Sequence, residues 1–228
     1  QYIDFDALGI DKDQFIKGMF SYEALWLPEY ASPENPEYIF SRQYAENQAD
    51  QENWVAYLAI RPNQLGGWSA TTPTQNLVNS YWTVTGEEPS LLSISERAAA
   101  FTELNTEFLA SGQTFSEFCA EKVADGTIKN YTFIQELRNR DSRLYASILL
   151  PFKGWFETVQ GGGDFYYRWW PEDAPGNESL SGYNFRKMTP LDKSSSGNDD
   201  GTADYPSFRY AEILLMFAEA HTHTTGYD

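Results

Sequence analysis

The clearest hydrophobic pattern in the middle of the chain covers residues 96–110, where apolar side chains recur every three or four positions. That spacing places them on one side of an α-helix. Ser93 and Glu96 have the spacing of a capping box, and Gly112 is a typical helix stop. The pattern therefore predicts an amphipathic helix over 96–110.

A second pattern of the same kind covers residues 115–124. Thr114 and Glu117 form another capping-box spacing, and Gly126 follows the last apolar position. Cys119, the one cysteine of the chain, lies on the apolar stripe of this segment. We therefore predict a second helix over 115–124 and interpret Cys119 as a small buried hydrophobic residue.

Strand-like patterns flank these helices. Residues 36–44 and 53–60 are rich in β-branched and aromatic side chains, and residues 143–150 alternate apolar with other positions. Each of these three segments predicts a short strand. Residues 61–75 and 151–205 are rich in glycine, proline and hydroxyl side chains and predict long loops.

Residues 205–220 combine an apolar helix pattern with three charged residues, Arg209, Glu212 and Glu219. The apolar stripe at i, i+3, i+4, i+7 and i+8 consists of Tyr210, Ile213, Leu214, Phe217 and Ala218. The segment predicts a helix that packs against other helices, so its charges require polar partners at the packing seam.

Composition narrows the classes of protein. The chain has 228 residues and is 41% hydrophobic, enough for a folded core, and its formal net charge is −17. Such a charge argues against nucleic acid or an anionic lipid surface as the main partner. No apolar run approaches the roughly 20 residues of a membrane-spanning helix. The chain starts at Gln1 without a leader pattern, so we expect any targeting segment to be removed or outside this sequence.

Enzymatic chemistry finds little support in the sequence. His221 and His223 are the two histidines, and both lie in the last eight residues, where a helix C-terminus favours a cation. Acid pairs such as Glu87–Glu88 and Glu172–Asp173 are common in an acidic chain. A glycosidase needs two carboxyl groups at a defined separation, which the sequence does not establish. We therefore predict that the protein is not an enzyme.

No cofactor is predicted. Residues 196–204, "SGNDDGTAD", contain oxygen ligands that suit Ca²⁺, but the twelve-residue calcium-loop pattern places Ala203 where a bidentate glutamate is required. The segment is therefore interpreted as an acidic loop, with calcium as the alternative. Residues 161–164, "GGGD", lack the lysine and hydroxyl residue of a phosphate loop.

Aromatic residues in polar loops are the most informative chemical feature. Aromatic residues make up 16% of the chain, and Trp68, Trp82, Trp155 and the run at 164–170, "DFYYRWW", lie outside the periodic segments. Such a ring can pin a loop to the core, or it can cover the apolar face of a pyranose while nearby polar groups bind its hydroxyls. Both interpretations stay open for each residue.

Alternation within the aromatic run favours exposure of some of its rings. In an extended chain Tyr166 and Trp170 point to the side opposite Tyr167 and Trp169. All four cannot face one core, so some are expected to face solvent or a ligand.

Several motifs together resemble the SusD/RagB family of surface nutrient-binding lipoproteins of Bacteroidetes. The strongest is "RYAEILLMFAEA" at 209–220. Further motifs follow in the family's order: "NPEYIFSRQY" (35–44), "TPTQNLVNSYWTVTGEEP" (72–89), "LRNRDSRLYASILLP" (137–151) and "GYNFRKM" (182–188). Ser142 replaces the proline that is usual in the family.

The resemblance implies a mainly α fold with long irregular loops and a few short strands. It also implies that residues 1–228 form a single, partial SusD-like region. We expect the lipidated N-terminal cysteine, most of the tetratricopeptide-type helical scaffold and the extreme C-terminal region of the family to lie outside this sequence.

The function implied by the resemblance is capture of oligosaccharide or polysaccharide at the outer surface of the outer membrane. Delivery would be to a SusC-like TonB-dependent transporter, with membrane attachment only through the lipid anchor. The predicted sugar platforms are Trp68, Trp155, Tyr166, Trp169 and Trp170. Two alternatives stay open: a protein-docking module of the same complex that binds no sugar, and a carbohydrate-active hydrolase.

The resemblance also suggests partners for the charged residues of the C-terminal helix. Glu212 and Glu219 are one heptad apart and lie on nearly one face of the helix. We expect them to contact Arg140, Asp141 or Arg143 of the "NRDSR" motif at 139–143 as part of the scaffold.

Overall fold

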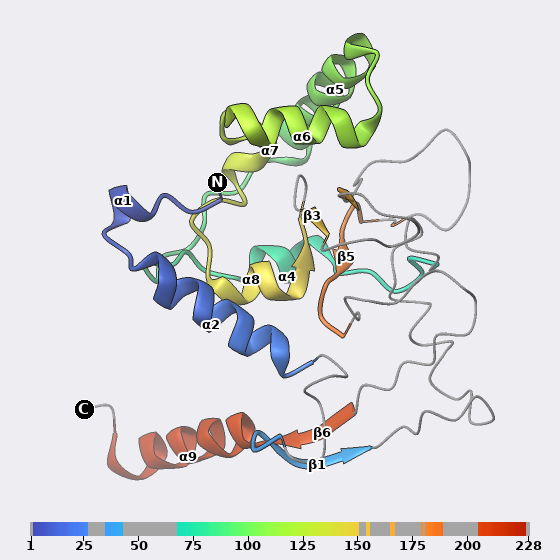
Figure 1. The fold of residues 1–228 in the computed structure, drawn as a ribbon. Coiled ribbons are helices and arrows are strands. Elements are labelled where there is room, and N and C mark those ends of the chain that lie inside the picture. Colours follow the sequence, from blue (N-terminus) through green and yellow to red (C-terminus); the bar gives the residue numbers. More distant parts are fainter. Residues whose placement is uncertain are drawn as a thin grey trace, which may run out of the picture.

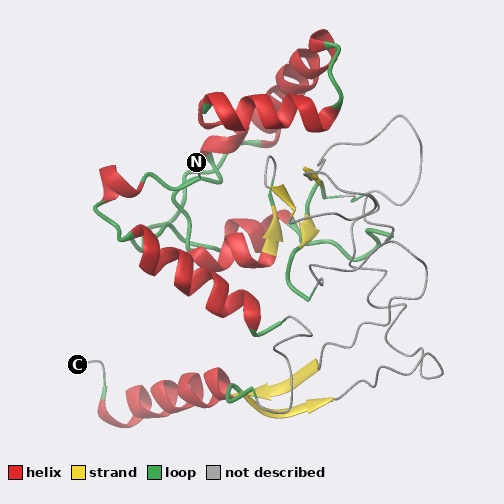
Figure 2. Ribbon diagram, in the orientation of Figure 1, coloured by secondary structure: helices red, strands yellow, loops and turns green. Residues whose placement is uncertain are grey.

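The structure, a computed structural model, describes residues 2–26, 35–42, 68–150, 154–155, 165–166, 179, 181–188 and 205–226. Helices dominate these residues, and the strands are short, so the expected mainly α fold is confirmed (Figure 2). The predicted strand at 53–60 lies outside the described residues.

The elements are labelled in Figure 1. The helices are α1 (Phe5–Leu8), α2 (Lys12–Ala24), α4 (Gln75–Asn79), α5 (Ile94–Ser111), α6 (Phe115–Asp125), the 3-10 helix η2 (Thr127–Asn130), α7 (Thr132–Gln135), α8 (Ser142–Ser147) and α9 (Tyr210–Thr225). The strands form antiparallel pairs: β1 (Tyr38–Arg42) with β6 (Tyr205–Arg209), β2 (Ile148–Leu149) with β5 (Asn184–Phe185), and β3 (Gly154–Trp155) with β4 (Phe165–Tyr166). The predicted strand at 36–44 is therefore confirmed as β1.

Both central helices begin and end as their sequences predict. Ser93 and Thr114 accept hydrogen bonds from the amides of Glu96 and Glu117, and both glutamates return the contact to the cap amide. Gly112 and Gly126 follow the last turns with φ of 67° and 74°, in the left-handed region that favours glycine. The two helices pack together above the centre of the molecule (Figure 1).

The core extends from the junction of α5 and α6 with the following short helices to α4, α8 and β2. Leu104 of α5 and Phe118 of α6 are each 1% exposed, and the ring of Phe133 in α7 packs in a tilted arrangement on that of Phe101, with 4.5 Å between ring centroids. Cys119 is fully buried, as predicted, and burial raises the pKa of its thiol to about 12. This core holds α5, α6 and α7 as one packed group.

The predicted strand at 143–150 is mostly wrong. Residues 142–147 form α8, which packs beside α2, and only Ile148–Leu149 are strand. The last four residues of α8, Leu144 to Ser147, are all buried. Four consecutive buried residues in a short helix show no 3.6-residue period, so the apolar positions at every second residue mimicked a half-buried strand.

The C-terminal segment starts as a strand and becomes a helix only at Tyr210. Its strand β6 pairs with β1, and Arg209 at the junction lies 3.6 Å from the carboxylate of Glu37. The guanidinium of Arg209 also lies 4.5 Å from the ring centre of Trp26, and the amine of Lys187 lies 3.5 Å from it. Arg209 therefore attaches this segment to the body of the protein.

The predicted packing seam of the C-terminal helix is wrong. Glu212 and Glu219 are exposed, and within the described residues α9 packs mainly on its own strand β6. The arginines of the "NRDSR" motif have other partners: Arg140 binds backbone carbonyls and Arg143 binds Asp141. The apolar stripe of α9 is likewise at the surface, with Leu214 51% and Phe217 69% exposed.

Candidate functional site

Three of the five aromatic residues predicted as sugar platforms lie among the described residues. Trp68 is half-buried. Trp155 on β3 and Tyr166 on β4 lie on paired strands, so their backbones are neighbours. Trp169 and Trp170 lie outside the described residues. Sugar binding by these five residues stays a prediction.

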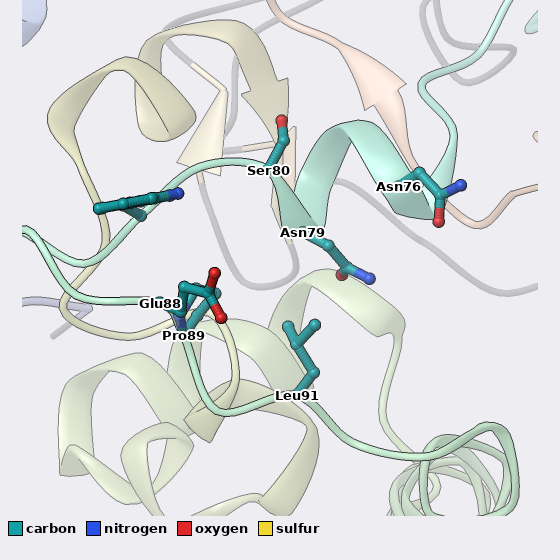
Figure 3. A pocket seen from close by; sticks show the side chains of 7 residues that line it. Asn76, Asn79, Ser80, Glu88, Pro89 and Leu91 are labelled. Carbon is teal, nitrogen blue, oxygen red and sulfur yellow. The ribbon is translucent and has the colours of Figure 1, made fainter.

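The structure adds a hollow that the sequence did not single out. It has a volume of about 300 Å³ and lies between the C-terminal end of α4 and the segment that follows the next turn (Figure 3). Its lining consists of Asn76, Asn79, Ser80, Trp82, Glu88, Pro89 and Leu91. A concave site that combines an aromatic ring with a few polar side chains is a typical arrangement for binding a small ligand.

Trp82 is the unusual member of this lining. Its side chain is 54% exposed and has no ring contact or hydrogen bond with any other described residue. Its backbone, in contrast, is fixed: its carbonyl accepts a 2.9 Å hydrogen bond from the amide of Asp141, and Thr83 forms a bridge with Arg140. A large flat ring is therefore held in solvent by a rigid main chain.

Helix α4 supplies the opposite wall of the hollow. Thr74 caps its start by accepting a hydrogen bond from the amide of Leu77, and Val78, 1% exposed, anchors its inner face in the core. Asn76 and Asn79 therefore stand on the outer side of the helix, and Figure 3 shows both amides directed away from its axis. The carboxamide oxygen of Asn79 accepts a 2.7 Å hydrogen bond from the side chain of Gln75.

The buried guanidinium of Arg140 stabilises the C-terminal end of α4. Arg140 is 1% exposed and donates hydrogen bonds to the carbonyls of Val78 at 2.8 Å and Asn79 at 3.3 Å. It also donates to the carbonyl of Tyr81, just beyond the helix, and to that of Glu136 at 2.7 Å. Helix ends leave carbonyls without partners, and this side chain satisfies them. Burial lowers the pKa of Arg140.

A tight turn brings Glu88 back toward α4. The amide of Thr83 donates to the carbonyl of Glu87 at 2.8 Å, and the amide of Glu87 donates to the Thr83 hydroxyl at 2.9 Å. Gly86 within the turn has φ of 82°, which glycine adopts without strain. The carboxylate of Glu88 consequently lies across the hollow from Asn79 (Figure 3).

The chemistry that this lining offers is binding. Among the described residues that line the hollow, Glu88 is the single acid and there is no histidine or cysteine. Hydrolysis of a glycoside by the usual route needs two carboxyl groups, and a nucleophilic serine needs a base. A ring, two amides, a hydroxyl and one carboxylate are instead the groups that stack on a sugar and bind its hydroxyls.

The described part of the chain shows neither a metal-binding cluster nor a membrane-spanning helix. No group of three or more histidine, cysteine, aspartate and glutamate side chains there is placed to hold a metal ion. The loop at 196–204, considered for calcium, lies outside the described residues. No described helix combines the length and apolarity needed to cross a membrane.

Comparisons with known proteins identify relatives of the fold. A sequence model of the SusD family matches residues 36–228. A solved structure of a SusD-like protein from Bacteroides fragilis superimposes with a TM-score of 0.56 at 24% sequence identity. The match covers 91% of this chain but 36% of that protein, so the chain spans little more than a third of its length. No curated protein sequence matches the chain.

Proposed function

The chain belongs to the SusD family, and from that premise we propose that it captures glycan at the cell surface, without cleaving it, for uptake by a SusC-like TonB-dependent transporter. The family implies a nutrient-binding role at the outer membrane. The hollow beside α4 adds a concrete place where a sugar can bind.

The observation that carries the proposal is the exposed indole of Trp82 on its fixed backbone. The apolar face of an exposed ring stays in contact with water, which is unfavourable, unless a ligand covers it. A pyranose presents an apolar face of matching size. Because Asp141 and Arg140 hold the surrounding main chain, little backbone conformational entropy is lost when the sugar stacks. Asn76, Asn79 and Glu88 supply donors and acceptors at the rim.

The test is calorimetric titration with a panel of oligosaccharides and polysaccharides, with analysis of the same samples for released sugar. Binding without product is expected, and Trp82→Ala is expected to weaken it by at least tenfold, about 1.4 kcal/mol. Phe40→Ala is the matched control, because Phe40 is 67% exposed on β1 and does not line the hollow.

Three outcomes contradict the proposal. Release of sugar from the samples would indicate a hydrolase. Absence of binding across the panel would remove the capture role. Equal affinity of wild type and Trp82→Ala for a bound glycan would place the site elsewhere, with the paired strands of Trp155 and Tyr166 as the next candidates.

A protein-docking role is the second candidate, and the exposed apolar stripe of α9 favours it. Ile213, Leu214 and Phe217 lie on one side of that helix and are 37%, 51% and 69% exposed. Contiguous exposed apolar surface is typical of an interaction site. If docking is the function, Leu214→Asp should abolish association with the partner transporter, while Trp82→Ala should leave it unchanged.

A further inference from the structure

We infer that Glu88 makes the hollow beside α4 selective for uncharged sugars over sugars that carry carboxylate groups, an inference that rests on the proposed function. The argument starts from the charges that face the hollow. Glu88 is exposed there, and no lysine, arginine or histidine is among the described residues that line it.

The neighbouring cations are already paired. Arg140 lies behind α4 with its donors directed at backbone carbonyls, and it is 1% exposed. Arg97, on the helix that follows Leu91, makes a two-point contact with Glu136 at 2.8 and 2.9 Å. Such charge-assisted pairs are strong, so neither guanidinium is available to a ligand in the hollow.

An anionic sugar would therefore enter without a compensating charge. Its carboxylate would face that of Glu88 at short range, within a chain whose formal net charge is −17. Like charges that are brought together on binding suppress the wrong ligand. An uncharged sugar meets the opposite situation, because a carboxylate accepts hydrogen bonds from two adjacent hydroxyls while the asparagine amides donate to others.

Glu87 provides a matched control one residue away. Its carboxylate accepts a 3.3 Å hydrogen bond from the Thr85 hydroxyl, it is exposed, and it does not line the hollow. Glu87→Gln and Glu88→Gln change the net charge by the same amount and keep the size of the side chain. A difference between them therefore isolates the position of the charge.

The experiment is titration of the wild-type chain and both variants with neutral hexose oligosaccharides and with uronate oligosaccharides of the same length and linkage. At low salt, wild type should bind the neutral ligand at least tenfold more tightly than the uronate ligand. This difference in affinity should decrease as added salt screens the repulsion. Glu88→Gln should strengthen uronate binding several-fold and weaken neutral binding several-fold. Glu87→Gln should change neither by more than about twofold.

Each contrary result is distinguishable. Equal affinity of wild type for both ligands, or equal effects of the two substitutions, overturns the selectivity while Trp82-dependent capture stands. Failure of every glycan to bind wild type overturns the proposed function and this inference together.

Discussion

Replacing Arg140 with methionine is expected to destabilise the protein far more than the same change at Arg143, three residues further along the same motif. Arg140 is 1% exposed and donates to the carbonyls of Val78, Asn79, Tyr81 and Glu136. Methionine fills similar space but donates nothing, so four inward-facing acceptors lose their donor. Three of these carbonyls, those of Val78, Asn79 and Tyr81, lie at the C-terminal end of α4 and directly before Trp82.

The expected loss follows from those four acceptors. Leaving a buried polar group without a partner costs at least about 1 kcal/mol, so the sum is about 4 kcal/mol. For a chain of this size about 1 kcal/mol corresponds to roughly 3 °C, which gives a fall in Tm of about 12 °C. Urea unfolding followed by circular dichroism measures the free energy, and a thermal scan measures the Tm.

Arg143→Met is the control for this change. The side chain of Arg143 is 61% exposed and pairs with Asp141 at 2.8 Å, and an exposed pair of this kind contributes about 0–1 kcal/mol. Equal losses from the two substitutions, or a loss below about 1 kcal/mol for Arg140→Met, would refute the reasoning that the buried guanidinium stabilises the end of α4.

Three further predictions concern the core and the groups with shifted pKa values. Burial, with a smaller contribution from Arg209, lowers the pKa of Lys187 from 10.5 to about 8. Between these values the unfolded chain binds the extra proton, so this group's contribution to the free energy of unfolding rises with pH. Denaturant unfolding at pH 7.5 and 9.5 should show that rise in wild type and lose it in Lys187→Met; parallel pH profiles would contradict it. Because Cys119 is fully buried and its thiol pKa is raised to about 12, a thiol reagent at pH 8 should modify it only after unfolding, and rapid modification of native protein would count against the burial. Leu104→Ala should cost about 3 kcal/mol, since Leu104 is 1% exposed, whereas Leu109→Ala, at a position 67% exposed on the same helix, should cost less than about 0.5 kcal/mol by urea unfolding.

The central helices were predictable because their ends are determined locally. A capping box needs contacts between residues three apart, such as Ser93 and Glu96, and the left-handed turn at Gly112 needs only a residue without a side chain. Neither depends on the rest of the fold. Burial of Cys119 followed from the same helical stripe.

Failure of the other predictions has tertiary causes. The last four residues of α8 are all buried, so this part of its sequence carries no amphipathic signal. Arg209 belongs to a strand whose partner, β1, is more than 160 residues earlier in the chain, and no local pattern records that pairing. The sequence therefore did not indicate that Arg209 pairs with Glu37, or that Glu212 and Glu219 are exposed.

Trp82 was visible in the sequence as a tryptophan in a polar stretch, but its importance was not. Its backbone is fixed by Asp141 and by the bridge between Thr83 and Arg140, about 60 residues away, and the sequence carries no sign of these contacts. Two local features of the sequence indicated an exposed ring. Trp82 belongs to no apolar helical stripe, and the turn that contains Gly86 begins at the next residue, Thr83.

The division between a fixed backbone and exposed side chains at this hollow has an evolutionary consequence. Arg140 and Asp141 set the course of the main chain from behind, whereas Trp82, Asn76 and Glu88 point outward from it. Substitutions at the outward positions can therefore change the surface chemistry of the hollow without disturbing the core. Related sequences can therefore diverge at these exposed positions, while the buried arginine behind them is constrained by its role in folding.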